Sequence, residues 1–145
     1  MIGSRRILVV DDDPASCEVV AYSLKSLGYR VAIAADGYRA LNMDFEDDLG
    51  LVILDVHMPV LDGIEILAML RQRHSMKSVK VLAMTGDESA EVRAALEVGG
   101  IDGFLTKPVD LTTLREEVGR LMAGNAQRDL GLFRRSLDRR RRNRD

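Results

Sequence analysis

The chain has 145 residues, a length that fits one domain, and its hydrophobic content of 46% without Trp predicts a largely aliphatic core. Its single cysteine excludes an internal disulfide, and no apolar stretch approaches the ~18 residues that a membrane-spanning helix needs. No signal-peptide cleavage pattern follows the first apolar run, so we expect a cytoplasmic protein without membrane insertion.

The charge is distributed unevenly along the chain. Residues 125–145 contain eight arginines and three acidic residues, a net charge of +5, whereas residues 1–124 carry a net charge of −7. We therefore divide the chain into a domain, 1–124, and an arginine-rich C-terminal tail or linker, 125–145.

The chain is predicted to begin with a buried strand at 7–10, followed by a helix. Asp13 is a good N-cap and Pro14 suits the first helical turn, while Gly28 closes the helix. The apolar face of this helix comprises Cys17, Val20, Ala21, Leu24 and Leu27.

A second short strand is predicted at 31–35, and a third at 51–55. Between them, residues 37–48 have a weaker helical pattern, and their acidic end is unfavourable against the helix dipole. Pro59 and the pair Asp62-Gly63 then indicate a loop.

The second half of the chain repeats the alternation. A helix is predicted to run to about His74, a strand occupies 79–84, and a helix over 87–98 is ended by the two glycines that follow it. A last strand, 103–105, precedes a helix capped by Asp110. Five strands that alternate with five helices favour a doubly wound α/β sheet covered on both faces.

Four of the predicted strands lead directly into reactive polar residues. In an open parallel sheet the carboxyl ends of the strands form one edge, where ligands bind, so these side chains should converge. Carboxylates favour a hard cation, whereas a hydroxyl and an ammonium favour an oxyanion, which together describe a Mg²⁺-assisted phosphoryl site. The residues are Asp11, Asp12, Asp13, Asp55, Thr85, Thr106 and Lys107.

The segments ILVVDDDP, LVILDVHMPVLDG, VLAMTG and GFLTKPVD resemble the receiver domain of bacterial two-component response regulators, in particular the single-domain chemotaxis regulators. The resemblance covers roughly residues 5–124. It implies a (βα)5 flavodoxin-like fold with a parallel sheet in the order 2-1-3-4-5. It also implies a phosphoprotein of signal transduction that is no enzyme and catalyses only its own phosphorylation and dephosphorylation.

The resemblance assigns the role of phosphoacceptor to Asp55, because the LDxxMP pattern of the family is present around it. It assigns the direct Mg²⁺ carboxylate ligand to Asp12, with Asp11 acting through water, and a further ligand to the backbone carbonyl of His57. Asp13 fits a helix cap better than a metal ligand.

The remaining site positions follow from the same resemblance. Thr85 would bond a phosphoryl oxygen, and Lys107 would place its ammonium beside Asp55. Phe104 occupies the aromatic switch position, where the ring moves inward as the strand-end hydroxyl moves towards the phosphate. The peptide bond before Pro108 is expected to be cis.

The implied partners are a sensor histidine kinase or a histidine phosphotransfer protein, together with a downstream target that contacts the face of the fourth helix, fifth strand and last helix. A rival reading, the Mg²⁺-dependent haloacid-dehalogenase phosphatases, shares the carboxylates after the first strand. Those enzymes need a further acidic pair after the lysine, and here only Asp110 follows promptly.

The tail leaves three readings open. Leu130, Phe133 and Leu137 form one apolar stripe at helical spacing, surrounded by arginines. The tail is then a solvated extension or linker, a docking segment for a partner or a second copy, or a nucleic-acid contact, which the acidic body disfavours.

Overall fold

The computed structural model of the protein describes residues 5–44, 48–58, 62–73, 76–87 and 89–124, so the tail, Pro59 and His74 lie outside the described residues. Five parallel strands form one sheet in the order β2-β1-β3-β4-β5. The strands are β1 (Arg6–Val10), β2 (Val31–Ala34), β3 (Leu49–Asp55), β4 (Lys80–Thr85) and β5 (Gly103–Thr106). The helices are α1 (Pro14–Lys25), α2 (Gly37–Asn42), α3 (Gly63–Gln72), α4 (Ala90–Gly99) and a last helix, 111–124.

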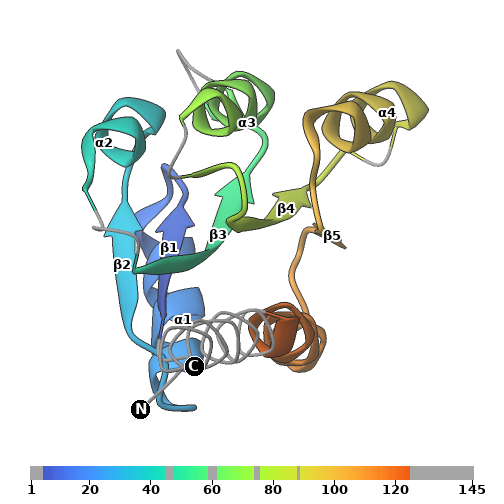
Figure 1. Cartoon of the computed structure of the whole chain (residues 1–145). Helices are drawn as coiled ribbons and strands as arrows, with labels where there is room; N and C mark the ends of the chain where they lie inside the picture. Colours follow the sequence, from blue (N-terminus) through green and yellow to red (C-terminus); the bar gives the residue numbers. More distant parts are fainter. Residues whose placement is uncertain (1–4, 45–47, 59–61, 74–75, 88, 125–145) are drawn as a thin grey trace, which may run out of the picture.

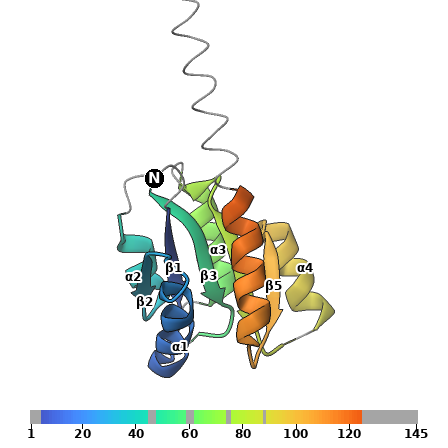
Figure 2. The same ribbon diagram turned by 90° about the horizontal axis from the view of Figure 1, so that it is seen from below.

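Helices cover both faces of the sheet. In Figure 1, α2, α3 and α4 lie on one side of the strands, and α1 and the last helix lie on the other side. Figure 2, turned by 90°, shows α1 and the last helix side by side in front of the sheet. The doubly wound fold and the strand order expected from the sequence are therefore confirmed.

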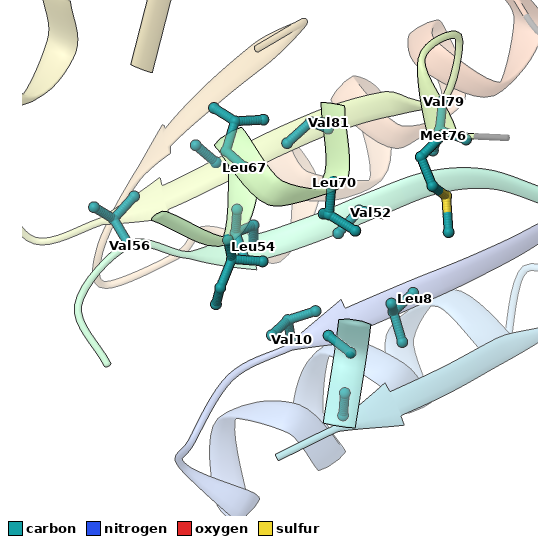
Figure 3. Close-up of a cluster of buried hydrophobic side chains, with 14 of the residues drawn as sticks. Leu8, Val10, Val52, Leu54, Val56, Leu67, Leu70, Met76, Val79 and Val81 are labelled. Atoms are coloured by element: carbon teal, nitrogen blue, oxygen red, sulfur yellow. The ribbon is translucent and has the colours of Figure 1, made fainter. Parts of the chain in front are cut away.

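Each face of the sheet has its own hydrophobic core. Figure 3 shows the core on the α3 side, where Val10, Leu54 and Val81 of three strands gather in one cluster with Leu67 and Leu70 of α3. On the opposite face, the strands pack against Cys17, Val20 and Leu24 of α1 and against buried positions of the last helix. Every residue of β3 is buried, as expected for a central strand covered on both sides.

The five helices of the described residues all begin with a side-chain cap at the carboxyl edge of the sheet. In each case an oxygen of the cap accepts a hydrogen bond from a backbone N–H of the first turn, which satisfies one otherwise unpaired donor. The caps are Asp13, Asp36, Asp62, Ser89 and Asp110.

One predicted helix end was wrong and another was confirmed. The second helix was predicted over 37–48 but ends at Asn42, because the backbone at Met43 is already extended. The first helix ends at Lys25 and is closed by Gly28, as predicted: Gly28 has a left-handed φ of 94°, its N–H donates to the carbonyl oxygen of Lys25, and the next N–H, that of Tyr29, donates to the carbonyl oxygen of Leu24. Leu27 was assigned to the apolar face of that helix, yet 54% of its surface is exposed, because it lies in this turn.

The fourth helix was predicted from residue 87 but begins at Ala90. The carboxylate of Asp87 accepts a hydrogen bond from the backbone N–H of Ser89 at 2.8 Å, which forms a turn ahead of the helix. Ser89 then caps the helix through its hydroxyl. At the other end, Gly100 closes α4 in the left-handed conformation with φ of 89°. None of the helices described here is long and apolar enough to cross a membrane.

Candidate functional site

Three carboxylates meet at the carboxyl edge of the sheet. Val10 pairs with Leu54 in the parallel ladder between β1 and β3, so Asp11 follows one strand beside Asp55 at the end of the next. One oxygen from each of Asp11, Asp12 and Asp55 lies within 4.8 Å of the others. Asp11 and Asp55 are buried, whereas Asp12 is exposed.

Lys107 reaches the same cluster from the segment after β5. Its Nζ lies 3.2 Å from Oδ2 of Asp11 and 3.2 Å from Oδ2 of Asp55, so one ammonium bridges the two buried carboxylates. The backbone N–H of Lys107 donates to the carbonyl oxygen of Thr85, which ties this segment to the end of β4. The peptide bond between Lys107 and Pro108 is cis.

The electrostatics of the cluster show that one ammonium does not neutralise it. Burial and repulsion from Asp11 raise the pKa of the Asp55 carboxyl, although Lys107 and the backbone N–H of His57 act in the opposite direction. Burial alone would lower the pKa of Lys107, but attraction to Asp55 and Asp11 outweighs it and raises that pKa. Three carboxylates thus face one ammonium, and ionisation of Asp55 is disfavoured where it stands.

The donor set fits a hard cation. All three side chains offer carboxylate oxygens, and the cluster of described residues contains no sulfur and no imidazole. His57 does not join it through its ring; the side chain is exposed and the backbone N–H donates to Oδ1 of Asp55 at 3.2 Å. Repulsion between two carboxylates at about 4 Å is worth roughly 1–4 kcal/mol, which a bound cation would remove.

Thr85 lies at the end of β4, next to the cluster. The ladders pair Asp55 with Met84, and Thr85 with Thr106, so the hydroxyl of Thr85 and the carboxylate of Asp55 stand at neighbouring strand ends. The Thr85 side chain is fully buried, and its Oγ1 accepts a hydrogen bond from the backbone N–H of Asp87 at 2.9 Å. Beyond it, a Cβ at Gly86 would meet no atom within 4 Å, so the approach to the site is open there.

A model of the response regulator receiver domain matches residues 7–119, which include all the residues of the site. The chain belongs to this family. The resemblance on which the sequence analysis relied is thus confirmed, and nothing supports the dehalogenase-like phosphatase reading.

Two curated relatives show how this receiver relates to longer proteins. The chain is 40% identical over 119 residues to the response regulator MprA of Mycobacterium bovis, covering 82% of this chain and 51% of that protein. It is 34% identical over 115 residues to the CAI-1 autoinducer sensor kinase/phosphatase CqsS of Vibrio cholerae, covering 79% of this chain and 17% of that protein. The chain thus spans about half of one relative and a small part of the other.

A solved structure extends the similarity to the fold. The receiver aligns with the chemotaxis response regulator CheY4 of Vibrio cholerae with a TM-score of 0.75 and 32% identity, covering 81% of this chain and 98% of that one. The matched part of this receiver thus covers almost the whole of that solved chain.

The sequence did not reveal every interaction near the receiver site. Phe104 is half-buried on β5, and the guanidinium of Arg93 in α4 lies 4.6 Å from the centre of its ring. Arg93 also pairs with Glu97, with 3.3 Å between Nε and Oε1. No motif marks Arg93, because its stacking on Phe104 depends on how α4 packs beside β5.

Two further residues stabilise the turn that carries the carboxylates. Asp13 is the cap of α1, as predicted, and accepts hydrogen bonds from the Ala15 N–H and the Ser16 hydroxyl at 3.1 and 2.9 Å. The buried thiol of Cys17 donates to the carbonyl oxygen of Asp11 at 3.2 Å. Burial, followed by repulsion from Asp11 and Asp13, raises the pKa of this thiol to about 11.

Proposed function

We propose that this receiver accepts a phosphoryl group on Asp55 from a phosphohistidine of a partner protein, in a Mg²⁺-dependent reaction. The observation that carries the proposal is the approach of Asp11, Asp12 and Asp55 to within 4.8 Å, with Lys107 bridging the two buried members. Paired carboxylates, a strand-end hydroxyl and an ammonium are the groups that phosphoryl transfer requires.

Asp55 is the nucleophile in this scheme. A carboxylate oxygen of Asp55 forms a bond to phosphorus while the bond from phosphorus to the imidazole nitrogen breaks, and the imidazole leaves with the electron pair. Lys107 stabilises the negative charge on the phosphoryl oxygens, and the Thr85 hydroxyl donates a hydrogen bond to one of them. Water later cleaves the acyl phosphate, which returns Asp55 to its free form.

The metal would be held by Asp12 and Asp55, by the backbone carbonyl of His57, and by Asp11 through water. Mg²⁺ at these ligands would supply charge neutralisation for the carboxylates and the phosphoryl oxygens. The chain contributes hard oxygen donors, of which Asp12 is exposed, and open space at Gly86 through which the phosphodonor can approach.

We further propose that the phosphorylated receiver signals by protein contact. New bonds from Thr85 and Lys107 to the phosphoryl group would bias a two-state equilibrium in which Phe104 moves inward. A sensor histidine kinase or a histidine phosphotransfer protein is the proposed donor, in keeping with the sensor kinase and the response regulator among the relatives. The face formed by α4, β5 and the last helix is the proposed contact for the downstream protein.

The test is phosphorylation of the isolated chain. The protein is incubated with acetyl phosphate and Mg²⁺, and its intact mass is measured. The wild type should gain one phosphoryl group, whereas Asp55→Asn should gain none, and EDTA should abolish the gain. Asp62→Asn, which changes the charge of a helix cap outside the carboxylate cluster, serves as the matched control and should be phosphorylated. A full adduct on Asp55→Asn contradicts the assignment.

A further inference from the structure

The first residue of α3 lies directly against the backbone that carries Asp55. A Cβ placed on Gly63 would lie 2.6 Å from the carbonyl oxygen of Asp55 and 2.6 Å from Cα of Val56. Both neighbours are backbone atoms, so no flexible side chain can move away. The backbone N–H of Gly63 also donates to the carbonyl oxygen of Val56 at 2.9 Å, which holds the helix start in this position.

Neither partner of this contact can move easily. β3 is a central strand with ladders to β1 and β4, and its pairing continues to Asp55 itself. On the other side, α3 is anchored in the core by Ile66, Leu67 and Leu70, which are at most 2% exposed. Anything larger than hydrogen at Gly63 must therefore displace either the start of α3 or the backbone of Asp55 and Val56.

The backbone from Asp55 to His57 carries two parts of the site. The backbone N–H of His57 donates to Oδ1 of Asp55, and the carbonyl of the same residue is a proposed metal ligand. We infer that Gly63 is a positioning residue: by lacking a side chain it lets α3 abut β3, and this contact sets where the Asp55 carboxylate and the His57 backbone stand relative to Asp11 and Asp12. The inference rests on the proposed function for its consequence, since the group so placed is the proposed phosphoacceptor.

Space rather than backbone conformation is the reason for glycine here. The positive-φ glycines among the described residues are Gly28 and Gly100, and Gly63 is not one of them. Two other glycines provide matched controls. A Cβ at Gly99 would lie 2.5 Å from a side-chain atom of Leu67, and a Cβ at Gly119 would meet nothing within 4 Å. Gly99→Ala thus disturbs the packing of α3 against α4 without touching the backbone of the site.

The experiment is a Mg²⁺ titration of Gly63→Ala, Gly99→Ala, Gly119→Ala and the wild type, followed by amide NMR well below each melting temperature. Disturbing residues that orient metal ligands typically weakens metal affinity by about 10–100-fold, and we expect Gly63→Ala to fall in this range. The two control variants should stay within about twofold of the wild type, because destabilisation alone does not change the affinity of the folded state. Wild-type affinity in Gly63→Ala, or an equal loss in Gly99→Ala, overturns the inference.

A second pair of variants decides the matter if Gly63→Ala does not fold. Asp62→Ala removes the cap of α3 and loosens the helix start, whereas Asp62→Asn keeps a good cap while removing the same charge. Weaker Mg²⁺ binding by Asp62→Ala than by Asp62→Asn supports the inference, and equal binding overturns it.

Spectra in EDTA separate this inference from the proposed function. Without metal, Gly63→Ala should shift the amide resonances of Val56 and His57, and Gly99→Ala should leave them in place. A wild type that binds no Mg²⁺ overturns the proposed function, and these metal-free shifts then decide the inference alone.

Discussion

Asp55 is a buried acid beside a second buried acid, and this environment gives the stability of the domain a defined pH dependence. Because the pKa of Asp55 is raised in the folded state, the unfolded chain releases this proton at lower pH than the native protein. Between the two pKa values the native state binds more protons, so the contribution of Asp55 to stability falls as the pH rises. Above the folded pKa the group is a net destabilising charge until a cation binds.

We predict that Asp55→Asn melts at a higher temperature than the wild type in EDTA, and that the gain is larger at about pH 7 than at about pH 4. The amide carries no charge at either pH, whereas more of the Asp55 carboxyl is ionised at the higher pH. Thermal melting at both pH values measures the difference, and Glu91→Gln, an exposed carboxylate on α4, controls for net charge. A gain that is equal at both pH values, or larger at low pH, contradicts the burial argument.

Lys107 provides the opposite case, a cation held between two carboxylates. We predict that Lys107→Met destabilises the metal-free domain by about 1–2 kcal/mol, because Asp11 and Asp55 lose their counter-charge. The effect should be smaller than the roughly 3–5 kcal/mol of a fully buried pair, since the Lys107 side chain is 29% exposed.

Mg²⁺ should then stabilise Lys107→Met more than it stabilises the wild type, because it relieves the greater repulsion. A native-state ligand adds about 2.7 kcal/mol at a hundredfold excess over its Kd. Melting curves with EDTA and with Mg²⁺ test this, and Lys77→Met, an exposed lysine outside the site, is the control. Equal stability of Lys107→Met and wild type in EDTA would show that the bridge does not compensate the carboxylates.

At the scale of the elements, the order and type of strands and helices could be predicted because apolar runs, glycines and caps are local signals. The end of α2 and the start of α4 were misplaced. The acidic end of residues 37–48 was recognised as unfavourable, but it did not locate the extended backbone at Met43, and a helical pattern does not show that the Asp87 carboxylate forms a turn with the N–H of Ser89 ahead of α4. The convergence of the site residues could be predicted because each of them lies at or just after the carboxyl end of a parallel strand. The contacts of Gly63 with Asp55 and of Arg93 with Phe104 depend on how neighbouring elements pack, and no sequence pattern encodes them.

The stacking of Arg93 on Phe104 links α4 to β5, and we predict a measurable coupling between the two residues. A cation–π contact at an exposed site is worth about 0.5–1 kcal/mol. A double-mutant cycle of Arg93→Ala and Phe104→Leu, followed by denaturant unfolding, should return a coupling of about this size. Glu97→Gln removes the ion pair of Arg93 while leaving the ring contact, and it should preserve the coupling. Additive effects in the cycle would show that the stacking contributes nothing.

At the scale of the whole molecule, the charges of the chain fall into two parts. The receiver portion, 1–124, has a net charge of −7, and the tail has +5. Every group of the proposed site lies between β1 and the segment after β5, so we propose that the receiver is functionally independent of the tail.

Deleting residues 125–145 should therefore leave phosphorylation of Asp55 and the Mg²⁺ dependence of melting unchanged. If the stripe of Leu130, Phe133 and Leu137 docks on another chain, the deletion will instead change the molar mass in light scattering or the affinity for a partner at two salt concentrations. Loss of phosphorylation in the truncated protein would contradict the independence of the receiver.

The thiol of Cys17 can be used to measure local opening of the fold near the site. It is the only cysteine of the chain, it is 3% exposed, and its thiol is tied to the carbonyl of Asp11. With a pKa of about 11 and no access to solvent, this thiol reacts with an alkylating reagent only after α1 has separated from β1. The labelling rate of the unmodified protein thus measures how often the carboxylate turn opens, and a cation that binds there should slow the reaction.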